Sequence, residues 1–210
     1  LVRQHRGAAE QTWAMVAPLL PKAAPRSGVT PGWRVKTRVD RLSDTAAGRV
    51  LAAWHGVRRI ESCEELRAHL GHPRHILCLG NGPTSEDPRL RDLRHDRLFR
   101  VNWRWRGRGF LENPDVVLVG HPLTMMKAPP CVFVFGRAEW ERTMLLRHLL
   151  SLRLYPPVYF TMERIASLVS SVDWHARPTN GALMVLLAAA CGPEKITLAG
   201  IDLFRHPDGR

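Results

Sequence analysis

A glycine-rich reversal near the middle of the chain has the residue types that can seat a phosphate. The apolar run of residues 76–79 ends in Gly80-Asn81-Gly82-Pro83. Such a turn brings backbone N–H groups and a following helix N-terminus to one point, and no side chain crowds a ligand there. Glycines are also common in ordinary turns, so this motif alone does not separate a ligand site from plain turn chemistry.

Polar residues follow other apolar runs in the same way. Asn102 ends Phe99-Arg100-Val101-Asn102, His121 follows a third run, and Asp202 follows the last one. A further motif, Arg177-Pro178-Thr179-Asn180-Gly181, stands directly before an apolar helical pattern. In parallel sheets ligands bind beyond the carboxyl ends of the strands, where loops and helix N-termini converge. We therefore expect these polar groups to share one edge of a sheet.

Strand and helix patterns alternate from residue 74 onward, which is typical of an α/β sheet. The strands are nearly all apolar, as in parallel strands that are covered on both faces. We predict a Rossmann-like, mostly parallel sheet flanked by helices over residues 73–210. The expected strands are His75–Leu79, Leu98–Val101, Val116–Val119, Val132–Phe135 and Ile196–Ala199, and the expected helices are Glu139–Leu152, Met162–Ser171 and Gly181–Ala190.

Residues 1–72 are expected to form a helical N-terminal extension that packs on this domain. Apolar residues between Thr45 and Arg58 recur on one helical side, and Ser62-Cys63-Glu64-Glu65 resembles a capping box that starts a helix to Leu70. The chain stops at Arg210, within a turn-like His-Pro-Asp-Gly sequence. We expect that further residues follow in the parent protein.

The composition is that of an ordinary globular protein with a strong positive charge. The 210 residues are 45% hydrophobic and 24% charged, which suffices for one substantial core. The formal net charge of +12 would attract an anionic partner, such as nucleic acid, a nucleotide sugar or an acidic glycan. The longest apolar run, Ala182 to Cys191, is far shorter than the roughly 20 residues of a membrane span, so we expect a buried helix there.

The four cysteines are interpreted as core thiols of a cytoplasmic protein. They lie far apart, three of them within apolar runs, and no CxxC pair or His/Cys cluster has the spacing of zinc ligands. No Asp-x-Asp pair is present either. Many glycosyltransferases use such a pair to hold a divalent cation, so the sequence predicts chemistry without a metal or other cofactor.

Taken together, these three motifs and a fourth, Gly200-Ile201-Asp202, closely resemble the bacterial sialyltransferases of glycosyltransferase family 42, which build lipooligosaccharide and capsule termini. The resemblance covers residues 75–204. The family has Gly-Asn-Gly-Pro-Ser, Phe-Arg-x-Asn, Arg-x-Thr-Ser-Gly before an apolar helix, and Gly-Ile-Asp-Phe-Tyr. It implies CMP-sialic acid as donor substrate and inverting transfer of sialic acid to a glycan acceptor, in the cytoplasm or in peripheral association with the inner face of the membrane.

The resemblance also implies a role for each matching residue. Arg177 corresponds to an active-site arginine, and His121 falls where the family has an asparagine that touches the sugar. The asparagines at the first two strand ends would hold the CMP moiety, and the Thr-Asn-Gly turn would contact the phosphate and carboxylate. The expected donor-binding residues are Asn81, Gly82, Asn102, His121, Thr179, Asn180, Gly181 and Asp202.

The catalytic set implied by the family is incomplete in this sequence. Transfer requires stabilisation of the departing phosphate and removal of a proton from the acceptor hydroxyl. The family uses two tyrosines and a histidine, but Phe204 stands at the first tyrosine's position and the chain ends before the other two. His206 is interpreted as a solvated turn residue. A non-catalytic nucleotide-binding relative is therefore an alternative to the enzyme.

Two structural interpretations and one other functional interpretation compete with this one. Asp202 could cap a turn, and Arg177 could pair with Asp173 on the surface, where ion pairs contribute about 0–1 kcal/mol. The segment from Asn102 to Phe110 interleaves aromatic residues with arginines, which resembles single-stranded nucleic acid binding. No helix-turn-helix or RNP-type pattern accompanies it, so we favour a basic loop flanking the nucleotide site over a nucleic-acid partner.

Overall fold

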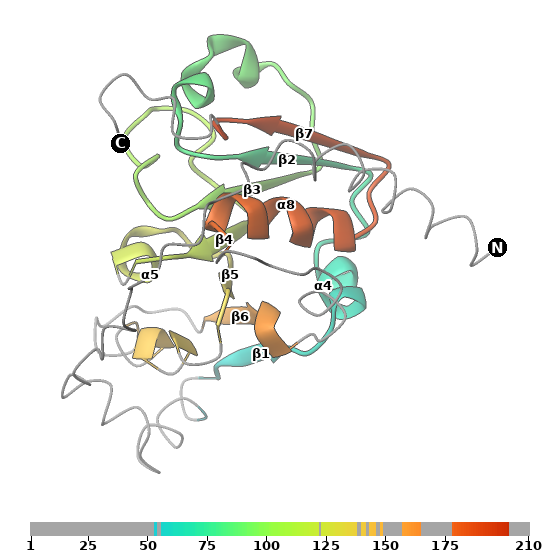
Figure 1. The fold of residues 1–210 in the computed structure, drawn as a ribbon, viewed down its shortest axis with the longest axis vertical. Coiled ribbons are helices and arrows are strands. Elements are labelled where there is room, and N and C mark those ends of the chain that lie inside the picture. The colour runs from blue at the N-terminus through green and yellow to red at the C-terminus, as the bar shows by residue number, and fades with distance from the viewer. Residues whose placement is uncertain are drawn as a thin grey trace, which may run out of the picture.

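The described residues form one parallel sheet with helices on both faces (Figure 1). In this computed structural model they are residues 53, 56–121, 123–137, 140, 141, 143–145, 148, 157–164 and 178–201. All strand pairs are parallel, which confirms the predicted α/β sheet. The strands are β1 Arg58–Ile60, β2 His75–Leu79, β3 Arg97–Val101, β4 Val116–Val119, β5 Val132–Phe135, β6 Val158–Thr161 and β7 Lys195–Ala199.

The strand order β1-β6-β5-β4-β3-β2-β7 contains one reversal that matters for ligand binding. From β2 the chain steps strand by strand to β6, and then returns to place β7 on the other side of β2 (Figure 1). The order of the strands along the sheet therefore reverses at β2. Such a topological switch point is where open α/β sheets bind ligands.

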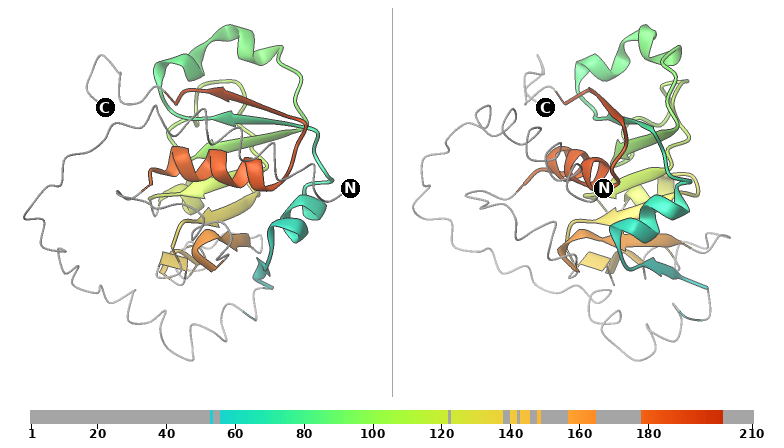
Figure 2. Two further views of the ribbon diagram at one scale, coloured as in Figure 1. Left: turned by 45° about the vertical axis from the view of Figure 1, so that its right-hand side comes forward. Right: turned by 90° about the vertical axis from the view of Figure 1, so that its right-hand side faces the viewer.

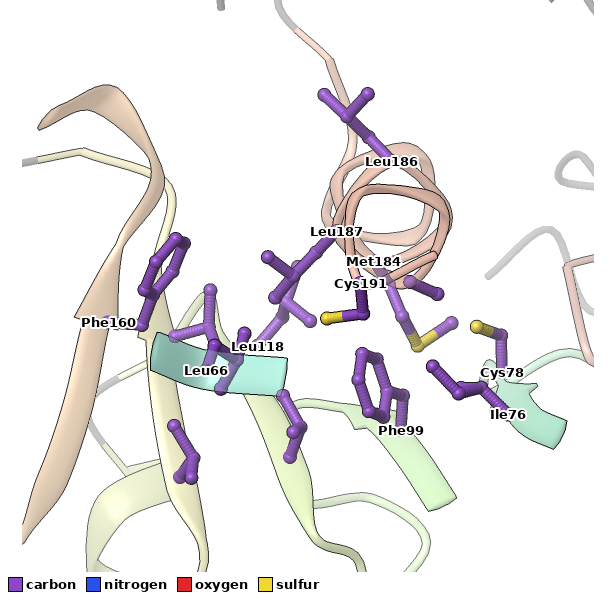
Figure 3. Packing of buried hydrophobic residues seen from close by; sticks show 14 of the residues in the cluster. Leu66, Ile76, Cys78, Phe99, Leu118, Phe160, Met184, Leu186, Leu187 and Cys191 are labelled. Atoms are coloured by element: carbon purple, nitrogen blue, oxygen red, sulfur yellow. The ribbon is translucent and has the colours of Figure 1, made fainter. Parts of the chain in front are cut away.

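One face of the sheet is covered by α4 (Cys63–His69) and α8 (Asn180–Ala190). In Figure 3, Met184 of α8 and Cys191, which directly follows α8, point toward Phe99 of β3, and all three side chains are buried. This cluster also includes the buried residues of β4, β5 and β6 that face the same way. It holds the N-terminus of α8 against the sheet.

The opposite face carries shorter helical segments. The 3-10 helices η2 (Pro83–Glu86) and η3 (Pro88–Arg91) lie at the β2–β7 end of the sheet, as both views of Figure 2 show. The helix α5 (Leu123–Lys127) packs Met125 into a second apolar cluster with Phe133 and Phe135. A further 3-10 helix of the described residues, η4 (Met162–Arg164), directly follows β6, and its Met162 packs in the cluster on the α4 and α8 face.

Two strands of the sheet were not predicted, and one of them corrects the expected helical extension. Residues 58–60 form β1, an edge strand that pairs with β6, so the sheet begins before the expected boundary at residue 72. Its Arg58-Arg59-Ile60 sequence is only partly buried and lacks the apolar run of a central strand. The rest of residues 1–72 before residue 53 lies outside the described residues, as does the end of the expected helix Met162–Ser171.

The predicted helix start at Ser62 is confirmed with one change in its hydrogen bonds. The Ser62 hydroxyl accepts a hydrogen bond from the backbone N of Glu65 at 3.0 Å. In a capping box the glutamate reaches back to the backbone N of the capping residue. Here Glu65 Oε2 instead accepts from the backbone N of Glu61 at 2.9 Å, so the cap extends one residue further.

The cysteines are free thiols in apolar surroundings. Burial raises the pKa of Cys63 to about 11 and that of Cys191 to about 12, and it also raises those of Cys78 and Cys131. These thiols are therefore poor nucleophiles at neutral pH. Among the described residues, no helix has the length and apolar character needed to cross a bilayer.

Candidate functional site

The two strand ends at the switch point are joined through backbone groups. Gly80 N donates to Ala199 O at 2.8 Å, and Gly82 N donates to Gly200 O at 2.9 Å. A Cβ on Gly80 would lie 2.1 Å from Gly200 O, so the close approach requires glycine. The N–H of Gly82, an expected donor-binding residue, is thus occupied within the fold.

Asn81 links the end of β2 to the end of β3. Its Nδ2 donates to Val101 O at 3.1 Å, which orients the amide across the sheet edge. Its Oδ1 is buried and has no hydrogen-bond partner among the described residues. A buried amide oxygen without a donor is costly, by about 1–3 kcal/mol, so this atom is suited to receive a hydrogen bond from a ligand.

Asn102 occupies a left-handed backbone conformation with φ of +57°. Asparagine tolerates this region better than most residues because its short amide can bond locally. The Asn102 Oδ1 accepts from the backbone N of Gly120 at 2.8 Å, and the Asn102 backbone N donates to Leu118 O at 2.9 Å. The end of β3 is thereby fixed to the end of β4.

Asn180 brings a third amide to the same place from the start of α8. A Cβ on Gly120 would lie 2.0 Å from Asn180 Nδ2 and 2.8 Å from Asn102 Oδ1. The Asn180 amide therefore lies directly on the bare backbone of Gly120, beside the Asn102 amide. Sequence reasoning singled out both asparagines but had no signal for the role of Gly120.

The N-terminus of α8 is capped by Thr179, whose Oγ1 accepts from Ala182 N at 3.2 Å. The backbone N–H groups of Asn180 and Gly181 have no acceptor within the described part of the chain, and no acidic residue stands in the first turn. Free N–H groups and the helix dipole favour an anion here. Gly181 leaves room for one, because a Cβ there would make only ordinary contacts.

His121 follows β4 and is exposed. Its Nδ1 accepts from Leu123 N at 3.2 Å, at the start of α5. Because Nδ1 is the acceptor in this contact, the tautomer that makes it carries the ring proton on Nε2. In this geometry His121 can donate a hydrogen bond from Nε2 to an oxygen at the sheet edge.

Arg100 belongs to the predicted motif Phe99-Arg100-Val101-Asn102, but the sequence did not predict that this arginine is buried. Arg100 is fully buried, donates to Leu111 O through Nε and Nη2 at 3.2 and 3.1 Å, and lies 5.3 Å from the Trp105 ring centroid. Burial, and then the charge of Arg108, lower the pKa of Arg100 to about 10. Arg108 Nη1 in turn donates to Ser85 Oγ at 2.5 Å, so positive charge lies close behind η2.

The structure thus brings Asn81, Asn102 and Asn180 together with the head of α8 at one edge of the sheet. Arg177 and Asp202, the other expected site residues, lie outside the described residues, as do Phe204 and His206. No group of three or more His, Cys, Asp or Glu side chains in the described segments is placed to hold a metal ion.

No family model matches the chain, and no curated protein matches it either. The fold defines an α/β protein with a parallel sheet, and the site is an amide-rich cluster at the carboxyl edge of that sheet. This arrangement fits a ligand that offers both neutral hydrogen-bonding groups and an anion.

Proposed function

We propose that the protein is a sialyltransferase-like glycosyltransferase that binds CMP-sialic acid and transfers the sugar to a glycan, with inversion. The observation that supports it most is the convergence of three asparagine amides on Gly120 and Val101, next to the N–H groups of Asn180 and Gly181, which have no acceptor among the described residues. Amides recognise neutral hydroxyl and amino groups, and a helix N-terminus recognises phosphate. A nucleoside monophosphate joined to a sugar offers both.

The unpartnered oxygen of Asn81 narrows the choice of ligand group. An amide oxygen accepts hydrogen bonds and repels phosphate oxygens, so it calls for a donor such as a ribose hydroxyl or the cytosine amino group. The Nδ2 group of Asn81 is already held by Val101 O, which fixes the direction in which Oδ1 points. Asn81 therefore acts as a nucleoside contact, while the phosphate lies near α8.

The transfer step follows from this placement. The bond between the anomeric carbon and the phosphate oxygen breaks as the acceptor hydroxyl attacks the opposite face of the sugar. The electron pair goes to the CMP phosphate, where the N–H groups of Asn180 and Gly181 stabilise its charge. His121 can donate a hydrogen bond from Nε2 to the same departing group. The proton of the acceptor hydroxyl goes to a base, for which no described residue is assigned.

Calorimetric titration of CMP, with AMP and UMP as controls, tests the proposal. We expect CMP to bind in preference to both, and Asn81→Ala to weaken CMP binding about tenfold or more while the fold stays intact. Asn113→Ala, in the exposed loop after Leu111, is the matched control and should bind CMP as the wild type does. Equal binding of the three nucleotides, or no binding, would overturn the proposal.

Turnover is tested separately, because a non-catalytic relative would bind CMP equally well. CMP release from CMP-sialic acid should depend on an added glycan acceptor if the protein is a transferase. Binding without acceptor-dependent release would leave a nucleotide-sugar-binding protein. Phe204→Tyr should raise the transfer rate if the missing hydroxyl assists the leaving group.

A further inference from the structure

A hollow of about 490 Å³ lies on the surface between the turn after β3 and the helix α5. It is lined by Trp103, Arg106 and Gly107, from the turn after β3, and by Met126 and Lys127 of α5. Both segments leave the carboxyl edge of the sheet, directly after Asn102 and His121 respectively. The hollow therefore opens from the edge at which the donor is proposed to bind, on the β3–β4 side of the sheet.

The lining joins positive charge to an aromatic surface. Lys127 Nζ lies 3.8 Å from the centroid of the Trp103 ring, which holds the ammonium group over the indole. Arg106 is exposed, and no acidic side chain lines the hollow. Met126 is 39% exposed, a large apolar side chain turned to solvent. A ligand that fits this lining carries a negative charge and an apolar face.

The basic-aromatic segment does not form a track for a nucleic acid strand. Its Trp105 is fully buried and donates through Nε1 to Asn102 O at 2.9 Å, so that ring belongs to the core. Phe110 does not line the hollow, and its ring faces the Arg91 guanidinium, which lies 4.8 Å from the ring centroid. Single-strand binding needs successive stacking rings along a charged groove. Of these three aromatic rings, Trp103 alone lines the hollow.

We propose that this hollow is the acceptor subsite and that the acceptor sugar bears a carboxylate. The volume is within the range of small-ligand sites. The carboxylate would bind Lys127 and Arg106, and the C–H face of the sugar ring would pack on Trp103 and Met126. The inference rests on the proposed function, since it assigns the second substrate of the same transfer.

The indole N–H signals in a ¹H–¹⁵N NMR spectrum provide a local readout. The Trp103 signal is identified by its loss in Trp103→Phe, and the protein is titrated with methyl β-D-glucuronide, with methyl β-D-glucoside as the uncharged control. We expect the glucuronide alone to move this signal. Lys127→Gln should weaken the glucuronide affinity about tenfold, as expected for loss of a charged hydrogen-bond partner. Lys195→Gln, on the exposed edge strand β7, should have no effect.

The outcomes separate this inference from the proposed function. An unmoved Trp103 signal, or an equal shift with the glucoside, would overturn the acidic-sugar subsite even if CMP binds. A glucuronide shift without CMP binding would keep the acidic-sugar site but overturn its assignment as an acceptor subsite. An oligothymidylate that displaces the glucuronide at lower concentration would overturn the proposal in favour of single-stranded nucleic acid.

Discussion

Asn102 and Gly120 are joined by a hydrogen bond of 2.8 Å, from the backbone N of Gly120 to the side-chain Oδ1 of Asn102. This bond ties the ends of two neighbouring strands, and the Asn180 amide lies on the same glycine. Gly120 has no positive φ, so backbone conformation does not require glycine there. The position is glycine because two amides occupy the space of a side chain.

Gly120→Ala should displace these amides and weaken CMP binding at least tenfold. Its methyl group would lie 2.0 Å from Asn180 Nδ2 and 2.8 Å from Asn102 Oδ1, so both side chains must move. We expect a stability loss of about 1–2 kcal/mol, comparable to one disturbed hydrogen bond. Calorimetry and urea unfolding measure the two effects.

Gly136→Ala is the matched control for this change. Gly136 also follows a strand, β5, but its added methyl would meet only the flexible Leu183 Cδ1, at 2.9 Å. We expect wild-type CMP affinity from this variant. If Gly120→Ala binds CMP as well as Gly136→Ala does, the two amides are not ligand contacts.

Gly80→Ala is expected to damage the fold itself. The methyl group would lie 2.1 Å from the backbone oxygen of Gly200. A backbone carbonyl cannot relieve this clash by changing rotamer, as a side chain can. Because the β2 and β7 ends would have to separate, we expect a loss of about 3 kcal/mol or more in the free energy of unfolding. Urea unfolding checks this, and a loss below about 1 kcal/mol would contradict the close approach.

Five of the strands could be predicted because each is a mostly apolar run. Four of them are buried on both faces, whereas the fifth, the edge strand β7, is partly exposed. Val116–Val119 and Val132–Phe135 have the predicted bounds, since flanking polar and proline residues mark their ends. The edge strand β1 was not predicted because it is only partly buried and two of its three residues are arginines. Its pairing with β6 depends on tertiary context that a local pattern does not contain.

The candidate site was predictable in part, for a physical reason. Parallel strands place their carboxyl ends together, so Asn81 and Asn102 could be assigned to one edge without coordinates. The contact of Asn180 with Gly120 depends on the position at which α8 packs on the sheet, and sequence spacing does not determine this position. The burial of Arg100 was also unforeseen, because an arginine within a strand usually points to solvent.

His75 should make the stability of the fold depend on pH. Burial, and then the charge of Lys195, lower the pKa of His75, whose Nε2 lies 2.9 Å from Thr197 Oγ1. Between the lowered pKa and the ordinary value of about 6.5 the unfolded chain binds more protons, so stability rises with pH. The stability present above about pH 6.5 is therefore lost as the pH falls through the folded-state pKa.

Urea unfolding of the wild type and His75→Gln at about pH 7.5 and pH 5 measures this dependence. We expect the wild type to lose more stability on acidification than the variant. Equal losses would show that the acid sensitivity arises elsewhere in the chain.

Gly181→Ala should separate stability from ligand binding, because the two are expected to change in opposite directions. The added methyl would lie 3.7 Å from Thr179 Oγ1 and 3.8 Å from Ile201 Cγ2, so the fold has room for alanine. Alanine in a helix is favoured over glycine by about 0.5–1 kcal/mol, and we expect the free energy of unfolding to rise by up to this amount. The same methyl would crowd a phosphate at the N–H groups of Asn180 and Gly181, so CMP affinity should fall several-fold.

Ala189→Gly, near the C-terminal end of α8, is the control. We expect it to lower the free energy of unfolding and to leave CMP affinity unchanged. A Gly181→Ala protein that is more stable and binds CMP normally would place the phosphate away from the head of α8.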